Sequence, residues 1–234
     1  MAHSGTRHQG IASEAVEDYA KAIHALQGAG EGAVGTSALA GRLGVSPGSV
    51  TAMLKRIGKM KLVRHEPYHG VRLTAAGERV ALEVIRHHRL IESYLAEALG
   101  MPWDRVHDEA EVLEHYISEE LEERMATVLG DPSRDPHGDP IPSRELALDA
   151  EDGVALATLR PGQAGTFVRV SDSDPQMLRY LAERGIRPGM GLSVRERQPF
   201  GGPVFVEVAE AEHAIGGELA ERMLVAAATS SPAR

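Results

Sequence analysis

The 234-residue sequence contains no cysteine. Without a thiol, the chain can form no disulfide scaffold, no thiolate nucleophile, no zinc ribbon and no iron–sulfur cluster. Any metal ion bound by this chain must therefore be held by His, Asp, Glu or Met side chains.

Long apolar runs are also missing. No run approaches the roughly 18 residues that a membrane-spanning helix needs, and the N-terminal residues lack the pattern of a secretion signal. We therefore expect a cytoplasmic protein with no membrane partner, long enough to bury a real hydrophobic core.

Positive charge is scarce overall but is concentrated near the N-terminus. The net charge of −9 combines +4 over residues 1–75, −11 over residues 76–150 and −2 over the remainder. Lys55, Arg56, Lys59 and Lys61 fall within seven residues. The whole-chain charge argues against nucleic-acid binding, but this basic cluster fits phosphate contacts. The acidic middle segment suits either a solvated helix surface or a cation site.

Residues 1–75 carry the pattern of a winged helix-turn-helix. Helical spacing predicts a helix from about Ser13 to Gln27. A second short helix then turns at Gly44 into a third, which Ser46 caps and Pro47 opens. Two β-rich runs, 62–65 and 71–74, predict the wing.

The rest of the chain predicts two further domains. Single long helices are expected over 74–99 and 104–129, followed by a proline-rich connector over 130–143. Short strands over 154–159, 165–170, 192–196 and 204–208, with a helix over 175–184, predict a small β-barrel. The fold class is thus α+β multidomain, with boundaries at 1–75, 76–145 and 151–228.

Histidines and carboxylates gather at ligand spacing on both long helices. His107, Glu111, Glu114 and His115 follow an i, i+4, i+7, i+8 pattern, which places them on one stripe beside an apolar face. The preceding helix carries one more pair, His88 and Glu92. A single pair of this kind is commonly a surface feature, but six such residues on two adjacent helices indicate a site for Mn(II) or Fe(II), which would tolerate Zn(II).

Several stretches together carry a family resemblance. They are "SVTAMLKRI", "RHHRLIESYL", "HDEAEVLEH", "DPHGDPIP" and "SDSDPQMLRYL". In these the chain resembles the diphtheria toxin repressor family of metal-dependent transcriptional regulators, and most closely its manganese-dependent branch. The resemblance implies a homodimeric repressor with a winged helix-turn-helix, a helical dimerisation and metal-sensing domain, and a C-terminal SH3-like (FeoA-like) barrel.

The resemblance also implies two metal sites. The primary, activating site would comprise Asp18, Glu111, Glu114 and His115. The ancillary site would comprise His88, Glu92 and His107, completed by Asp172, with Asp174 and Gln176 as alternatives in the barrel.

The residues at three positions bear on which ion binds. Iron-sensing members have a thioether where this chain has Asp18 and a cysteine where it has Glu111, and harder oxygen donors favour Mn(II). Some manganese-branch members carry a second carboxylate at the position of Lys21, so separate primary and ancillary sites fit this chain better than a paired-manganese cluster.

The resemblance predicts a double-stranded, palindromic DNA operator as partner, with metal acting as corepressor. Small side chains at the start of the recognition helix should touch thymine methyl groups and phosphates, and basic side chains should touch phosphates. The predicted DNA contacts are Arg7, Ser46, Pro47, Ser49, Thr51, Ala52, Lys55 and Arg56.

Other interpretations remain open at this point. The sensed ion could be Fe(II), with Zn(II) or Co(II) as substitutes in vitro. A di-metal carboxylate enzyme or a metalloprotease is less favoured. A ferritin-like site needs Glu-x-x-His from two helices and a thermolysin-like protease needs His-Glu-x-x-His, and we expect neither pattern here. A winged-helix regulator of organic ligands would bind DNA regardless of metal. We expect no enzyme and no organic substrate, a structural turn at His137 between Asp135 and Asp139, and an exposed His87.

Overall fold

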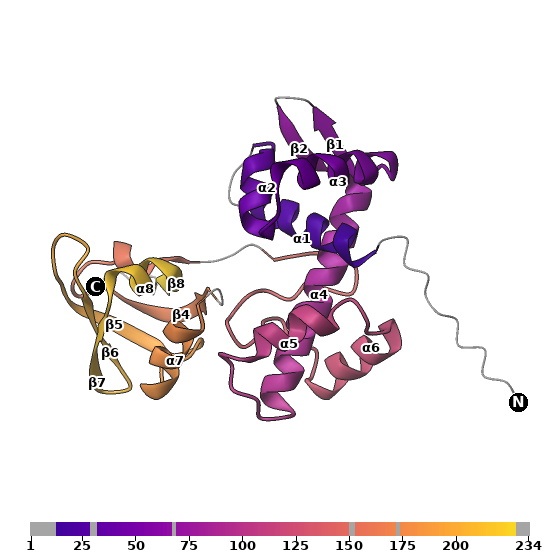
Figure 1. The fold of residues 1–234 in the computed structure, drawn as a ribbon. Helices are drawn as coiled ribbons and strands as arrows, with labels where there is room; N and C mark the ends of the chain where they lie inside the picture. The colour runs from indigo at the N-terminus through magenta and orange to yellow at the C-terminus, as the bar shows by residue number, and fades with distance from the viewer. Residues whose placement is uncertain (1–12, 29–31, 67–68, 150–152, 172–173, 228–234) are drawn as a thin grey trace, which may run out of the picture. The chain divides into compact units, whose positions relative to one another are not determined.

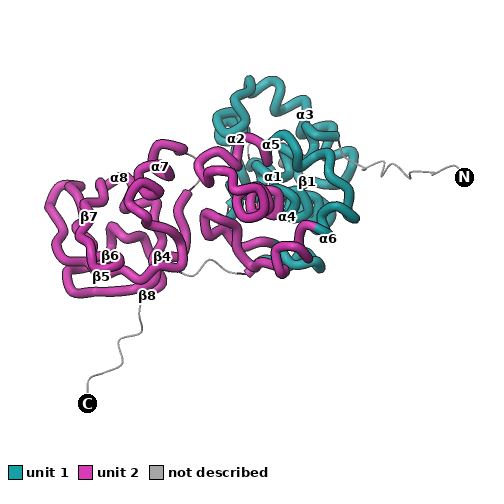
Figure 2. The backbone as a smooth tube through the Cα atoms, turned by 90° about the horizontal axis from the view of Figure 1, so that it is seen from below, with its two compact units in different colours: residues 1–88, 111–124, 142–148 teal, residues 89–110, 125–141, 149–234 magenta. Residues whose placement is uncertain are grey.

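The computed structural model describes residues 13–28, 32–66, 69–149, 153–171 and 174–227. Two predicted site residues, Arg7 and Asp172, lie outside these ranges. The chain forms two compact units, shown in Figure 2. Unit 1 comprises Met1–His88, Glu111–Arg124 and Pro142–Leu148, and unit 2 comprises Arg89–Ala110, Met125–Ile141 and Asp149–Arg234.

The N-terminal part of unit 1 is a winged helix-turn-helix, as predicted (Figure 1). Its helices are α1 (Glu14–Gly28), α2 (Thr36–Leu43) and α3 (Pro47–Lys59). Gly44 ends α2 in the left-handed conformation, with φ of 64°, which glycine adopts without strain. The Ser46 side chain then accepts a hydrogen bond from the Ser49 amide (3.1 Å) and so caps α3.

The wing is a hairpin of β1 (Val63–Glu66) and β2 (Gly70–Leu73). The two strands pair antiparallel, with Val63 opposite Leu73, and an isolated bridge joins Val34 to Val71. Buried side chains from all three helices and the hairpin form one apolar cluster, which includes Val16, Ile23, Leu39, Leu54, Ile57 and Val71. This shared core fixes α3 against the wing.

The helical segment differs from the prediction at one place. Helix α4 (Ala75–Glu97) is long, as expected, but the single helix expected over 104–129 is two helices, α5 (Val106–Leu113) and α6 (Glu119–Val128). The chain turns after Leu113, whose carbonyl accepts the Tyr116 amide (3.0 Å). Ser118 then starts α6 by accepting the amides of Leu121 and Glu122. Serine competes well for such free amides, which explains the break.

Unit 2 contains a six-stranded antiparallel sheet in the order β3-β8-β4-β5-β6-β7. Its elements are β3 (Val154–Ala155), the 3₁₀ turn η1 (Leu156–Thr158), β4 (Ala164–Val170), α7 (Pro175–Glu183), β5 (Gly191–Arg197), β6 (Val204–Val208), β7 (Ala211–Ile215), α8 (Gly217–Arg222) and β8 (Met223–Ala227). The sequence prediction found neither β7, α8 nor β8, and it extended β3 over η1. Register shifts at 167/169 and 194/196 bend the sheet around a core that includes Phe167, Val194, Val206 and Met223.

Within the described ranges, none of the helices combines the length and the apolar character needed to cross a membrane.

Candidate metal centre

Three of the four predicted primary ligands meet in unit 1. Asp18 comes from α1, while Glu114 and His115 lie in the turn that follows α5, beyond the helical stripe on which the sequence placed them. One donor atom from each of the three lies within 4.8 Å of the others. His115 Nε2 is 3.1 Å from Asp18 Oδ1 and 3.6 Å from Glu114 Oε1. Two carboxylates and an imidazole at these distances suit a divalent cation with hard donors.

The surroundings of this group concentrate negative charge. Burial raises the pKa of Asp18, and the charges of Glu114 and Glu111 add to the effect, against the opposing influence of His115 and Lys21. Glu114 is only 1% exposed. Crowded, buried carboxylates are costly unless a cation neutralises them, so the electrostatics also fit a metal ion.

Glu17 is a residue of this site that the sequence analysis missed. Its Oε2 lies 2.6 Å from His115 Nδ1, so the ring is held from the side opposite Asp18. Metal-binding histidines commonly use their second nitrogen in this way. The signal in the sequence was its place beside Asp18 on α1.

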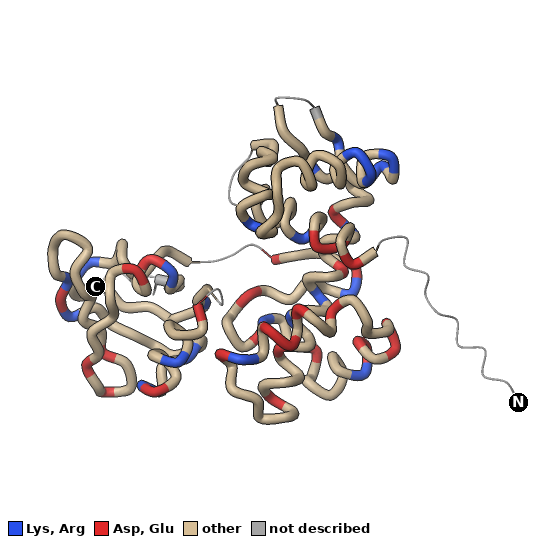
Figure 3. The backbone as a smooth tube through the Cα atoms, in the orientation of Figure 1, with Lys and Arg blue, Asp and Glu red and all other residues tan. Residues whose placement is uncertain are grey.

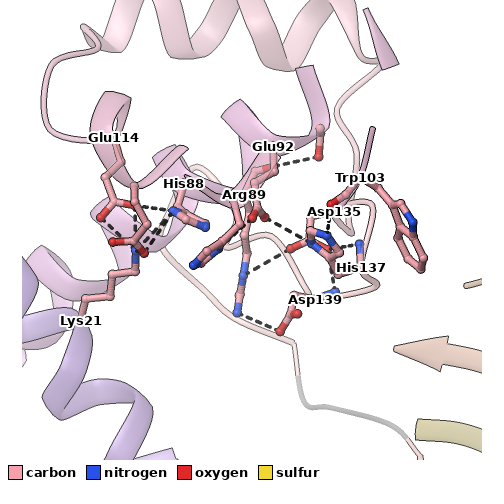
Figure 4. A network of polar contacts seen from close by, with 12 residues as sticks. Lys21, His88, Arg89, Glu92, Trp103, Glu114, Asp135, His137 and Asp139 are labelled. Carbon is pink, nitrogen blue, oxygen red and sulfur yellow. Dashed lines mark hydrogen bonds and ion pairs between the residues drawn. The ribbon is translucent and has the colours of Figure 1, made fainter. Parts of the chain in front are cut away.

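The fourth predicted primary ligand, Glu111, belongs to an adjacent group with His88 and Glu114. Lys21 lies at the centre of this group, as Figure 4 shows for His88 and Glu114. Its Nζ donates to Glu111 Oε1 (2.6 Å) and to both Glu114 oxygens (2.9 and 2.8 Å), and it lies 3.3 Å from His88 Nδ1. His88 Nδ1 also contacts Glu114 Oε2.

Two of the predicted ancillary ligands meet in unit 2. His107 Nδ1 lies 3.2 Å from Glu92 Oε1, and Glu92 is fully buried. The third ligand, His88, is one turn before Glu92 on α4. Of the barrel alternatives, Asp174 caps α7 by accepting the amide of Gln176 (2.9 Å), and Asp172 lies outside the described residues.

A second polar cluster in unit 2 surrounds His137, which is fully buried (Figure 4). Asp135 Oδ1 accepts the amides of His137 (2.8 Å) and Asp139 (2.9 Å), which makes this segment a turn, as predicted. His137 also stacks on Trp103, and its Nε2 lies 2.8 Å from the Trp103 carbonyl. Glu92, Asp135 and His137 together form a further group with metal-binding geometry, which the sequence analysis did not predict.

Neighbouring charges shift the pKa values of two buried groups in this cluster, His137 and Asp135. Burial opposes protonation of His137, but the contact with Glu92 and the charges of Glu92 and Asp135 outweigh it and raise the pKa of His137 to about 9. Burial, Asp139 and Glu92 raise the pKa of Asp135 well above its ordinary value. Arg89 Nη2 lies 3.2 Å from Asp139 Oδ1 and contributes a further positive charge.

The expected exposure of His87 is wrong. His87 is buried, with Nδ1 3.1 Å from the Glu114 carbonyl and Nε2 3.1 Å from Glu122 Oε2. It points away from His88, as the helical spacing requires, but the residues after α5 cover that side of α4. Sequence spacing gives the direction of a side chain and not what packs over it.

The predicted DNA contacts within the described ranges share one face of α3. Ser46, Pro47, Ser49, Ala52, Lys55 and Arg56 are exposed and Thr51 is half-buried, whereas Val50, Leu54 and Ile57 face the core. Lys59 and Lys61 are exposed nearby, and Figure 3 shows basic residues gathered at this end of α3. Acidic residues are frequent along the helical segment that follows.

One sequence stretch has the letters of a zinc protease motif. Residues 65–69 read "HEPYH". The expectation that this motif does not occur is therefore wrong in its letters. His65 and Glu66 lie in strand β1, however, whereas the protease motif requires a helix that presents both histidines on one face. The stretch therefore offers no such site.

Three family models match the chain in succession. They are the iron dependent repressor N-terminal DNA binding domain over residues 12–71, the iron dependent repressor metal binding and dimerisation domain over 74–143, and the FeoA domain over 154–227. The matches follow the order winged helix-turn-helix, helical segment and sheet that the structure displays.

Curated relatives extend the match at the level of whole proteins. The diphtheria toxin repressor of Corynebacterium glutamicum is 37% identical over 196 residues, which cover 79% of this chain and 85% of the relative. The iron-dependent repressor IdeR of Mycobacterium tuberculosis is 33% identical over 180 residues, which cover 72% of this chain and 78% of the relative.

Solved structures include manganese regulators. A manganese-dependent transcriptional repressor in complex with manganese is 40% identical, with a TM-score of 0.83 over 91% of this chain and 100% of that one. ScaR with bound Zn²⁺ is 30% identical, with a TM-score of 0.73 over 90% of this chain and 98% of that one. The chain belongs to the diphtheria toxin repressor family, and it is a metal-dependent, DNA-binding transcriptional repressor and not an enzyme.

Proposed function

We propose that this repressor senses Mn(II), which acts as its corepressor in metal homeostasis. The carrying observation is the meeting of Asp18, Glu114 and His115 in a group that has oxygen and nitrogen donors and no sulfur. Such a set favours Mn(II) over softer ions. Fe(II) is the second candidate, since one of the curated relatives is named an iron-dependent repressor.

The proposed primary ligands belong to two parts of unit 1. Asp18 is on α1 of the DNA-binding head, and Glu111, Glu114 and His115 are at the end of α5 and in the turn beyond it. A bound divalent ion would supply the positive charge that these carboxylates share. Asp18 would then hold α1, and with it the head, to the helical segment. The ancillary site would be built by His88, Glu92 and His107 with a barrel residue, Asp172, Asp174 or Gln176.

We assign DNA binding to residues 1–75, dimerisation and metal sensing to 76–145, and the barrel to 151–228. Exposed apolar side chains on segment 111–124 support a dimer surface there, namely Val112, Leu113, Tyr116 and Leu121. A two-fold dimer presents two equal α3 helices, so the operator should be palindromic.

Binding of a labelled palindromic operator tests the proposal. Fluorescence anisotropy is measured with Mn(II), Fe(II) under anaerobic conditions, Zn(II), Co(II) and a chelator. We expect the tightest binding with Mn(II), at least tenfold tighter than with chelator, which corresponds to about 1.4 kcal/mol. Equal affinity in chelator would refute the corepressor role, and a consistent preference for Fe(II) would favour the second candidate.

The Glu111→Cys variant tests the choice of ion. A thiolate in place of a carboxylate should shift the metal response towards softer ions such as Zn(II). Glu97→Cys, which makes the same change at the end of α4 and away from the proposed ligands, is the matched control and should respond as the wild type does. An unchanged Mn(II) response in Glu111→Cys would contradict the assignment of Glu111 to the primary site.

A further inference from the structure

Lys21 places a fixed positive charge among residues that could themselves hold a metal ion (Figure 4). We propose that the Lys21 ammonium group is a built-in cation that fills the position between His88, Glu111 and Glu114 in place of a metal ion. The primary centre of each protomer then accepts a single ion, on the Asp18 side. This inference rests on the proposed function.

The first step of the argument is the number of donors. An ammonium group has three N–H donors, and three carboxylate oxygens surround Nζ at 2.6, 2.9 and 2.8 Å. The lone pairs that a metal ion would need at this position are already directed at Lys21. A divalent ion placed there would also lie within a few ångström of a positive nitrogen, at a large electrostatic cost in a partly buried site.

The second step is the charge that Lys21 neutralises. Glu114 is buried, and Glu111 contributes a second carboxylate to the same group. Without a cation these carboxylates would repel each other, and removal of one partner from such a cluster leaves a charge uncompensated. Lys21 supplies that cation from α1, the same helix that carries Asp18.

The third step is the place of the Glu114 carboxylate, which borders both positions. Its Oε1 lies 3.6 Å from His115 Nε2 and its Oε2 contacts His88 Nδ1, while Lys21 Nζ donates to both oxygens. Asp18 and Lys21 are three residues apart, so they lie on the same face of α1. Asp18 contributes to the proposed metal position, and Lys21 fills the position beside it. The Asp18 position then offers Asp18, Glu114 and His115 to a metal ion. Glu111, the fourth proposed primary ligand, borders this position and accepts from Lys21 through its Oε1.

The test counts Mn(II) ions in the full-length protein. All variants carry His107→Ala, which removes one proposed ancillary ligand and so leaves the primary centre to be counted. Lys21→Met removes the charge and roughly keeps the side-chain length, Lys21→Arg keeps the charge, and Lys59→Met removes a lysine charge from an exposed position on α3. Titration calorimetry gives the number of ions per protomer, and electron paramagnetic resonance detects coupling between two neighbouring ions.

We expect one uncoupled Mn(II) per protomer in the His107→Ala parent, Lys21→Arg and Lys59→Met. Lys21→Met should bind two, with the spectrum of a coupled pair. One uncoupled ion in a folded Lys21→Met, or a coupled pair in the parent, would overturn the inference while leaving the proposed function intact. If Lys21→Met fails to fold, Lys21→Gln provides the same count. Absence of any Mn(II) binding by the wild type would instead refute the proposed function.

Discussion

His87 illustrates how one imidazole can have a role quite different from that of its neighbour. His88 faces Lys21 and Glu114, whereas His87 forms contacts with the Glu114 carbonyl and with Glu122. Burial opposes its charge, but the interaction with Glu122 and the Glu83 charge prevail, so the pKa of His87 is raised. Burial also opposes the charge of Glu122, yet His87 and Arg86 outweigh it and lower the pKa of Glu122.

These two shifts predict a pH window for stability. The raised pKa of His87 means that its contribution is complete below its ordinary value of 6.5 and is lost as pH rises through the folded-state pKa. The lowered pKa of Glu122 means that its contribution is complete above 4.5 and is lost as pH falls. Metal-free His87→Gln should therefore be less stable than the wild type by roughly 1–3 kcal/mol between these values. Urea denaturation at several pH values checks this, and a deficit that stays constant up to alkaline pH would contradict it.

Sequence reasoning at this scale predicted candidate ligands but not their contacts. Spacing and family resemblance pointed to Asp18, Glu114 and His115, which the structure brings together. The central place of Lys21 and the support from Glu17 depend on how α1 packs beside the end of α5 and the turn that follows. These contacts join residues that are 90 and 98 positions apart in the sequence. Local periodicity carries no information about such tertiary contacts.

At the scale of elements, the start of α4 is fixed by an unusually close approach. A Cβ added to Gly77 would lie 2.0 Å from the Leu62 carbonyl oxygen, which also accepts the Thr74 amide (2.9 Å). Glycine is ordinarily a poor helix residue. At this position the missing side chain lets the helix pack directly on the backbone of Leu62, just before β1.

Gly77→Ala should therefore destabilise the protein, by roughly 1–3 kcal/mol, although alanine is the better helix former. Gly41→Ala is the matched control, because Gly41 lies in α2 with nothing within 4 Å of the added Cβ. That variant should be stabilised by about 0.5–1 kcal/mol. Chemical denaturation of both variants gives the comparison, and equal stabilisation of the two would show that the close approach is absent in solution.

The elements were predictable where local signals are strong and not where they compete. Ser46 with Pro47, and Gly44 before them, mark the helix-turn-helix unambiguously. The apolar spacing over 104–129 continues beyond the observed end of α5 and so predicts one long helix. The helix is interrupted because Ser118 caps the start of a new one, α6. In the sheet, β7 and β8 lacked the run of β-branched residues that revealed β6.

Across the whole molecule, the charges are separated along the chain. The first 75 residues carry +4 and the next 75 carry −11, so DNA and metal ions are attracted to different segments. Phosphate contacts release counterions from DNA and make the affinity depend on salt. The exposed basic end of α3 should dominate that dependence.

Lys55→Ala should weaken operator binding about equally for related sequences, and it should lower the slope of log affinity against log salt by about 1 per subunit. Arg195→Ala removes one positive charge from an exposed, Glu207-paired position on β5 and should leave the slope unchanged. Anisotropy titrations over a series of salt concentrations measure both slopes. A slope that Lys55→Ala does not alter would place the phosphate contacts elsewhere.

The stacking of Trp103 on His137 has a practical consequence. Trp103 is the single tryptophan of the chain, and it is buried in unit 2. The guanidinium carbon of Arg187 lies 5.1 Å from the centroid of its ring. Because the indole stacks on the imidazole, its surroundings depend on the position of His137. The protein thus contains an intrinsic optical reporter beside Glu92, and any ligand that displaces His137 will register as a change in tryptophan fluorescence without a label.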